Sequence, residues 1–187
     1  MILYLHGFRS SPHSAKARRV REVMDARGQG SQLICPQLPP SPREAMQLAH
    51  TLVSDVAAES LAVIGSSLGG YYATALAEAR GCRAVLLNPA VRPAQGLAQH
   101  VGLQTAWHSD DQFEFLPEYL DELGSLEVAR ITQPERYFLI AATGDEVLDW
   151  REMVAHYPGA RQRVIEGSDH GLSDFDQYIE EVLAFCA

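Results

Sequence analysis

The sequence predicts an α/β fold in which helices cover both faces of a parallel sheet. Short apolar runs of strand length alternate along the chain with segments whose apolar residues recur at helical spacing. This alternation is typical of parallel strands joined by helical crossovers. Glycine and polar residues follow several of the strands, at the ends where such sheets carry their working loops. We therefore expect residues 1–187 to form a single domain with about six parallel strands.

Composition narrows the class of protein. The chain has 187 residues, of which 47% are hydrophobic, so it can bury a full core. Its formal net charge of −9 argues against nucleic acid or an anionic membrane as a partner, since both need a positive surface. Cys35, Cys82 and Cys186 form no C-x-x-C motif, and we find neither a signal peptide nor a long apolar run. We expect a reduced, cytoplasmic protein.

The first two strands and the first helix follow from their end signals. Residues 2–5 and 32–35 are short apolar runs of strand type. Ser14 can cap a helix that runs to about Arg27. We expect the basic residues of this helix to form a solvated outer face: Lys16, Arg18, Arg19 and Arg21.

A capping box introduces the second helix. Residues 41–44 read Ser-Pro-Arg-Glu, which combines S-x-x-E with a proline at the first helical position. Apolar residues at helical spacing then continue to about Val56, so this helix has one face for the core.

Residues 61–79 contain the most informative motif. An apolar strand at residues 61–64 runs into Gly-Ser-Ser-Leu-Gly, and an alanine-rich helix follows. The five residues fit G-x-S-x-G with Ser67 at the centre. This pattern is typical of a strand, a sharp turn and a helix that together expose the serine hydroxyl. The alternative is an ordinary glycine-rich turn, because so short a motif also occurs by chance.

The later part of the chain repeats the alternation. Strands are expected at residues 83–87, 137–142 and 161–165. A helix is expected at about residues 150–156, and Ser173 can cap the last helix.

Complementary side chains follow three of these strands. Ser67 follows the third strand, Asp145 the fifth and His170 the sixth. A serine hydroxyl needs a base to take its proton, and the base needs a third group to orient it. Histidine suits the first task because its unperturbed pKa is about 6.5. The order serine, acid, histidine is that of α/β-hydrolases, so we predict these residues as nucleophile, acid and base, with the backbone N–H groups of Phe8 and Leu68 as the oxyanion hole.

Each assignment has an alternative. Ser66 becomes the nucleophile if the turn is shifted by one residue. Asp149 becomes the acid if Asp145 merely lies at the start of the next helix. Asp169 directly precedes the predicted base, which normally points the two side chains apart, so we do not assign it as the acid. His6 can contact substrate, although bracing the oxyanion loop is the preferred interpretation.

No motif predicts a metal site or a cofactor. No histidine pair has H-x-H or H-E-x-x-H spacing, and neither a G-x-x-x-x-G-K-[ST] loop nor a strand-linked G-x-G-x-x-G is present. The remaining histidines are interpreted as surface or core residues: His13, His50, His100, His108 and His156.

Residues 93–135 interrupt the alternation and are predicted to be a cap insertion. We find no clear strand between residues 90 and 135, but two short helices are expected near residues 93–101 and 117–123. A connection of this length inside a compact domain is usually functional. Aromatic residues gather there, as a cap over an acyl pocket or as a small satellite core: Trp107, Phe113, Phe115 and Tyr119.

Five motifs in order resemble those of the YqiA-type esterases, which are small bacterial α/β-hydrolases that lack the first two strands of the full fold. The motifs are His6–Pro12 with Ser14 and Lys16, Gly65–Gly70, Asn88–Pro93, Gly144–Asp149 and Asp169-His170. The resemblance spans nearly the whole chain. It implies a minimal three-layer α/β-hydrolase fold and cleavage of acyl esters and acyl-CoA thioesters, with Ser67, Asp145 and His170 at the triad positions. The chain departs from the family at Gly171 and Leu172, where serine and phenylalanine are usual, so substrate preference stays open.

Three functions remain as alternatives. The first is hydrolysis of a small-molecule carboxylic ester, which we favour because all three triad chemistries are present. The second is hydrolysis of an acyl-CoA thioester, for which Arg9, Lys16 and Arg92 can supply cations to the phosphates of CoA. The third is a non-catalytic binding protein that uses residues 93–125 as a partner surface. The candidate substrate contacts are Arg9, Trp107 and Phe113.

Overall fold

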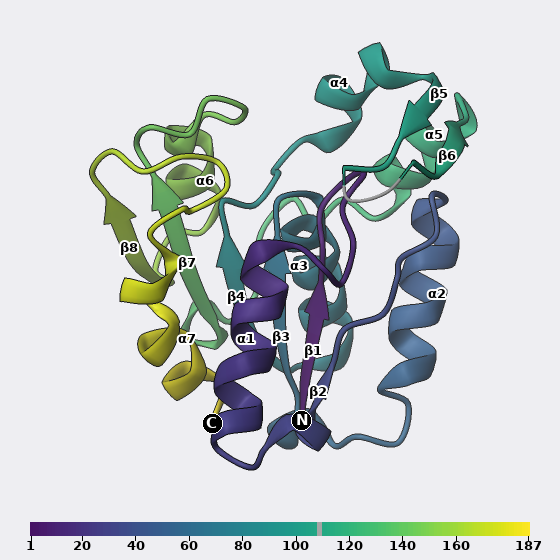
Figure 1. Cartoon of the computed structure of the whole chain (residues 1–187). Helices are drawn as coiled ribbons and strands as arrows, with labels where there is room; N and C mark the ends of the chain where they lie inside the picture. The colour runs from purple at the N-terminus through teal and green to yellow at the C-terminus, as the bar shows by residue number, and fades with distance from the viewer. Residues whose placement is uncertain (108–109) are drawn as a thin grey trace.

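The computed structural model describes residues 1–107 and 110–187. Its main sheet contains β1 (Ile2–Leu5), β2 (Leu33–Ile34), β3 (Ala62–Ser66), β4 (Arg83–Leu87), β7 (Tyr137–Ala142) and β8 (Arg161–Ile165). These six strands are parallel and lie in the order β2-β1-β3-β4-β7-β8 (Figure 1). The predicted parallel sheet is therefore confirmed. All of its strands end at the same edge of the sheet, the upper one in Figure 1.

Helices cover both faces of the sheet. They are α1 (Ala15–Ala26), α2 (Pro42–Leu52), α3 (Leu68–Arg80), α4 (Pro93–Leu97), α5 (Glu118–Ser125), α6 (Trp150–His156) and α7 (Ile179–Cys186). The buried residues of α1 and α7 belong to one core, and those of α2, α3 and α6 belong to the other (Figure 1). Helix α6 has the bounds predicted for it.

The first strand shows how the sheet divides its side chains between the two cores. Leu3 and Leu5 pack on the side of α2 and α3, whereas Ile2 and Tyr4 pack on the side of α1 and α7. All four are at most 6% exposed. A strand covered on both faces needs a continuous apolar run rather than alternation, and this is the pattern that predicted β1.

Residues 93–135, the predicted cap insertion, contain two strands where no strand was expected. β5 (Gly102–Thr105) and β6 (Gln112–Phe115) pair in an antiparallel hairpin between α4 and α5. Its strands are half-buried or exposed at every residue but Phe115, with Leu103 at 67%, so the sequence lacks the hydrophobic signal of a core strand. Phe115 is the buried anchor, because its ring packs edge-on against Phe8 at a centroid distance of 5.1 Å. The hairpin therefore depends on a contact with the loop after β1.

Side chains cap the first turns of α2 and α6, but the cap predicted for the last helix is wrong. The side chains of Ser41 and Asp149 accept hydrogen bonds from backbone N–H groups in the first turns of α2 and α6, at 3.2 and 2.9 Å. Ser173 was wrongly expected to cap the last helix, which begins at Ile179. The N–H of Ser173 donates to the carboxylate of Asp169 at 2.9 Å, so Ser173 belongs to the preceding turn.

Helix α1 departs from the prediction in two respects. Ser14 occupies the N-cap position, but its side chain accepts no hydrogen bond from the first turn of the helix. The basic face is not uniformly solvated. The guanidinium of Arg21 donates to the carbonyls of Gly30 and Leu33 at 2.7 and 2.9 Å, and Lys16 reaches the loop after β8. A helical pattern cannot show such contacts, because the carbonyls belong to other elements.

Gly69 provides a stability prediction, because α3 crosses β1 at this residue. A Cβ at Gly69 would lie 2.0 Å from the carbonyl oxygen of Leu5, which is backbone of a central strand and cannot move cheaply. We expect Gly69→Ala to lower the free energy of unfolding by about 3 kcal/mol or more, measured by urea denaturation. Gly124→Ala is the matched control. Gly124 lies in α5 with nothing within 4 Å of its Cβ position, so alanine is expected to be neutral or to stabilise by up to about 1 kcal/mol. Equal losses in both variants would contradict this account.

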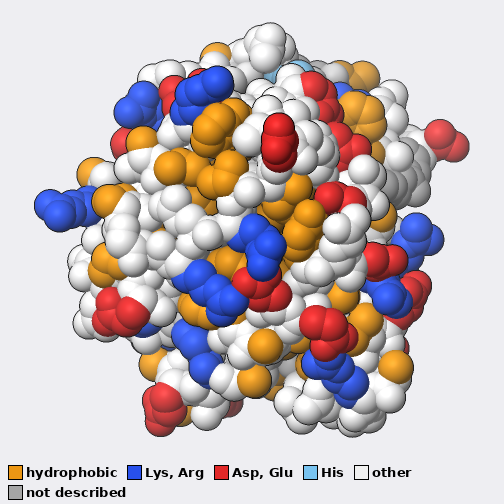
Figure 2. Space-filling view, turned by 90° about the vertical axis from the view of Figure 1, so that its left-hand side faces the viewer, with side chains coloured by type: hydrophobic (Ala, Val, Ile, Leu, Met, Phe, Trp, Pro, Cys, Tyr) orange, Lys and Arg blue, Asp and Glu red, His pale blue; other side chains and the backbone are white. Residues whose placement is uncertain are grey.

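The face that carries β8 and α7 has a mixed surface. Figure 2 shows basic and acidic side chains interspersed there with hydrophobic ones. Glu181 of α7 pairs with both Arg161 and Arg163 of β8, at 2.5 and 2.7 Å. The arginines are exposed and Glu181 is half-buried, so the pairs lie at the protein surface, where single ion pairs contribute little stability. This face presents no uniformly basic surface. Among the described residues, no helix is both long and apolar enough to cross a membrane.

Candidate active site

Ser67 lies in a strained turn between β3 and α3. Its φ of 55° and ψ of −123° are unusual for a residue with a side chain. Hydrogen bonds fix the turn from both sides, because the N–H of Ser67 donates to Leu87 and its carbonyl accepts from Gly70 and Ala90, at 2.9 to 3.1 Å. Strain of this kind persists only where the surroundings hold it. The strand, sharp turn and helix predicted from G-x-S-x-G are present.

A chain of hydrogen bonds joins three distant parts of the sequence. Nε2 of His170 lies 3.0 Å from Oγ of Ser67, and Nδ1 of the same ring lies 2.7 Å from Oδ2 of Asp145. The side chain of Asp145 is fully buried, and that of His170 is 20% exposed. The structure therefore brings together the three residues predicted as nucleophile, base and acid.

Both oxygens of the Asp145 carboxylate have partners. Oδ2 faces the imidazole, and Oδ1 accepts hydrogen bonds from the N–H groups of Val147 and Leu148, each at 2.8 Å. This turn fixes the plane of the carboxylate before any substrate arrives. Asp149 caps α6 instead.

The predicted oxyanion donors lie on either side of Ser67. Leu68 is the first residue of α3, so its N–H has no intrahelical carbonyl to which it could donate. Gly7 brings the loop after β1 against the serine, because a Cβ on this glycine would lie 3.5 Å from Ser67 Oγ. Phe8 follows it directly. His6 is buried beneath this loop, where Nε2 accepts from the N–H of Leu38 at 3.0 Å and Nδ1 lies 3.0 Å from the carbonyl oxygen of Gly7. His6 thus braces the loop.

Asn88 is a site residue whose role the sequence did not reveal. It is fully buried at the end of β4 and adopts a φ of 43°. Its Nδ2 donates to the carbonyls of Asp169 and His170, at 3.0 and 3.2 Å, and its Oδ1 accepts from the N–H of Ala142 at 2.8 Å. Asn88 therefore ties the histidine loop to the sheet. An unusual asparagine after a strand was the available signal, but it does not specify a partner.

A cavity of about 810 Å³ opens above Ser67, between α4 and the loop that leads to α6. Its size is within the usual range for small-molecule sites. Most of its wall is apolar, with contributions from Val91, Leu97, Leu148 and Met153. Ser67 and His170 lie on the wall as well, so the predicted nucleophile and base border the space that a ligand would enter.

The three candidate substrate contacts occupy different positions. Arg9 and Trp107 line the cavity, and the Arg9 guanidinium lies 4.2 Å from the centroid of the Trp107 ring. Arg9 also donates to the carbonyl of Thr105 at 2.6 Å. Phe113 is not among the described residues of the cavity wall. It packs edge-on against Phe8 at 5.9 Å, and so supports the oxyanion loop from outside.

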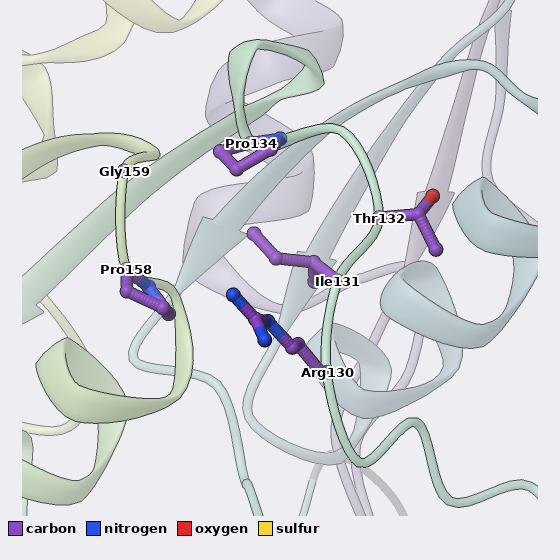
Figure 3. A pocket seen from close by; sticks show the side chains of 6 residues that line it. All are labelled: Arg130, Ile131, Thr132, Pro134, Pro158 and Gly159. Atoms are coloured by element: carbon purple, nitrogen blue, oxygen red, sulfur yellow. The ribbon is translucent and has the colours of Figure 1, made fainter.

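A second cavity, of about 670 Å³, shares no described lining residue with the first. Figure 3 shows the side chains that line it. This cavity lies between residues 130–134 and residues 158–159, and its lining consists of Arg130, Ile131, Thr132, Pro134, Pro158 and Gly159. None of these six residues is a carboxylate, a histidine or a thiol. The chemistry described above is therefore confined to the first cavity.

Within residues 1–107 and 110–187, no group of three or more histidine, cysteine, aspartate or glutamate side chains is placed to hold a metal ion. His108 lies outside the described residues.

Comparisons place the chain among known proteins. Residues 1–187 match the model of a family described as "Uncharacterised protein family (UPF0227)". The fold is similar to that of a protein from Agrobacterium vitis S4, with a TM-score of 0.79 and 17% identity over 100% of this chain and 87% of the other. It is also similar to mouse alpha/beta hydrolase domain-containing protein 10 (TM-score 0.72, 16% identity, 100% and 90% covered). A third similar structure is a monoacylglycerol lipase from Paleococcus ferrophilus. Its TM-score is 0.69 and its sequence identity is 16%, over 98% of this chain and 94% of the other. The chain therefore has the α/β-hydrolase fold.

Proposed function

We propose, from the premise that this chain belongs to the YqiA family (UPF0227), that it is a serine hydrolase that cleaves carboxylic esters through an acyl-serine intermediate. The observation that carries the proposal is the hydrogen-bonded chain from Ser67 through His170 to Asp145 at the wall of a largely apolar cavity. Hydrolases and lipases among the structural neighbours support the reaction class. An alcohol, an imidazole and a buried carboxylate in this order activate the alcohol as a nucleophile.

The proposed reaction has two halves. Nε2 of His170 takes the proton of Ser67 as Oγ attacks the ester carbonyl carbon, and the same nitrogen then gives the proton to the departing alcohol. Asp145 keeps the proton on Nδ1 and stabilises the imidazolium. In the second half, His170 deprotonates a water molecule that attacks the acyl-serine, which releases the acid and restores Ser67. No metal ion or cofactor takes part in this scheme.

The negative oxygen formed in each half needs fixed donors. We propose the backbone N–H groups of Phe8 and Leu68, which flank Ser67 on its two sides. The start of α3 adds the partial positive charge of a helix N-terminus. Removal of one such donor typically lowers the rate by about 10²–10³-fold.

Labelling tests the proposal directly. The protein is incubated at neutral pH with a fluorophosphonate probe, and the adduct is located by mass spectrometry of the digested protein. We expect one adduct, on the peptide that contains Ser67. The absence of an adduct would favour the third alternative, a non-catalytic binding protein. An adduct on another residue would reject Ser67 as the nucleophile.

The acyl-CoA alternative needs free cationic side chains that can bind the phosphates of CoA. Arg9 is engaged by Trp107 and Thr105, and Lys16 is engaged by a loop carbonyl, whereas Arg92 is exposed at the cavity wall. Two of the three cations are thus already paired, which favours a small neutral ester over a CoA thioester. Comparison of kcat/KM for an aryl acetate, a longer aryl ester and an acyl-CoA decides between the two.

We also propose that the protein is cytoplasmic and binds neither nucleic acid nor membrane.

Leu97 provides a prediction about the acyl chain. It lies in α4 on the cavity wall, so Leu97→Trp adds bulk inside the cavity. We expect kcat/KM for an aryl octanoate to fall roughly tenfold or more, while hydrolysis of the aryl acetate changes less than about threefold. Ala98→Trp is the matched control, because the neighbouring Ala98 is exposed and is not among the cavity-lining residues that the structure describes. If both substrates lost activity equally, the acyl chain would not lie beside α4.

A further inference from the structure

Side chains from other parts of the chain form hydrogen bonds with the backbone of the loop that carries His170. Two residues of the loop, Ser168 and Leu172, have positive φ values of 57° and 50°, which are costly for residues with side chains. The N–H of His170 donates to the carboxylate of Glu146 at 3.0 Å, and its carbonyl accepts from Asn88 at 3.2 Å. Side chains of other elements therefore keep the base in its place.

Lys16 is a third such contact, and it brings a charge. Its Nζ donates to the carbonyl of Gly171 at 2.5 Å and lies 3.5 Å from the carbonyl oxygen of His170. Lys16 belongs to α1, and it lines the same cavity as His170. A charge-assisted bond to a carbonyl is roughly twice as strong as a neutral one.

We propose that Lys16 is a positioning residue for His170, and that its ammonium group fixes the backbone at residues 170–171 so that Nε2 points at Ser67. This inference rests on the proposed function of the site. Loss of the positive charge weakens the contact with the carbonyls and lets the imidazole leave the line between Ser67 and Asp145. Lys16 touches no reacting atom in this role.

The charge on Lys16 is sensitive to pH. Burial lowers the pKa of its ammonium group to about 8, although Asp169 and Asp145 act in the opposite direction. The other titratable groups among the described residues of this cavity wall are Tyr4, His6, Arg9, Arg92, His100, Glu146, Asp149, Glu152 and His170. Because the ammonium form is lost as pH rises through about 8, the contact is complete below this pH and weakened above it.

The test combines kinetics with a readout that needs no turnover. In the wild type, we expect kcat for an aryl acetate to fall roughly 3- to 10-fold between pH 7 and 9.5, and the imidazole ¹H–¹⁵N signals of His170 to shift with a midpoint near pH 8. Lys16→Met is expected to lower kcat at pH 7 by roughly tenfold with KM changed less than about threefold, and to abolish both alkaline changes. Lys16→Arg, which stays charged, is expected to keep kcat at pH 7 and lose the alkaline decline.

Arg18→Met is the matched control, because it removes a positive charge from the exposed face of the same helix. It is expected to leave the kinetic profile and the His170 signals unchanged. Melting temperatures measured at each pH separate the effects from unfolding. An alkaline decline and a His170 shift that both persist in Lys16→Met would overturn the inference. If the wild type neither hydrolyses esters nor reacts with the fluorophosphonate, the proposed function fails, and the His170 signals still decide whether Lys16 acts on this residue.

Discussion

Ser67→Ala is expected to lower kcat for ester hydrolysis by roughly 10⁴-fold or more. The reason is that Oγ of Ser67 lies 3.0 Å from Nε2 of His170, and alanine has no atom at this position that can form an acyl intermediate. The proposed oxyanion donors remain in this variant, so it can still bind the ester and support slow direct attack by water. The first measurement is the initial rate of aryl acetate hydrolysis. The second is the amount of fluorophosphonate adduct that forms on the protein.

Ser66→Ala is the informative companion to this variant. Ser66 is the alternative nucleophile, but it is a buried residue of β3. We expect this variant to keep its activity within about tenfold and to label normally. If Ser67→Ala still labelled while Ser66→Ala did not, the turn would have been assigned one residue too late.

Asp145→Asn is expected to lower kcat by about 10⁴-fold, as loss of the orienting acid does in other serine hydrolases. Oδ1 of Asp145 accepts from two backbone N–H groups, so an asparagine keeps its oxygen there and turns its NH₂ group toward His170. An NH₂ group donates to Nδ1 and thereby moves the ring proton to Nε2. A ring protonated at Nε2 cannot take the proton of Ser67. The fold is not expected to change, which circular dichroism and the melting temperature check.

Asp149→Asn separates the two candidate acids. Asparagine is as good an N-cap residue as aspartate, so α6 should keep its first turn. We expect kcat to change less than about threefold, because the Asp149 carboxylate contacts the start of α6 rather than the imidazole. A larger loss in Asp149→Asn than in Asp145→Asn would reverse the assignment of the acid.

The positions of the reactive residues were predictable because each depends on a local signal. A buried parallel strand is a continuous apolar run, and the residue after it lies at the functional edge of the sheet. Ser67 and Asp145 follow such runs. His170 follows β8, an edge strand that begins with Arg161, Gln162 and Arg163 and was predicted from its place in the alternation of strands and helices. The bounds of α6 were predictable for a similar reason, since Asp149 caps it within the same short stretch of sequence.

The contacts that refine the site were not predictable from the sequence. Lys16 and Asn88 bind backbone carbonyls, and a carbonyl is present at every residue, so no pairing of residue types marks the contact. Helical periodicity therefore assigned Lys16 to the solvent. The β5–β6 hairpin was missed because its one deeply buried residue, Phe115, packs on Phe8, which is more than a hundred residues away in the sequence.

The contacts between Arg9 and the β5–β6 hairpin have a consequence for how this scaffold can diverge. Arg9 donates to Thr105, accepts from the N–H of Trp107 and stacks on its ring, and Arg9 directly follows Phe8. An insertion that enlarges the hairpin would therefore also displace the residue proposed to polarise the ester. Helix α4 lines the cavity through Leu97. Laboratory evolution toward bulkier acyl groups should accordingly accumulate its changes in α4 and spare the hairpin.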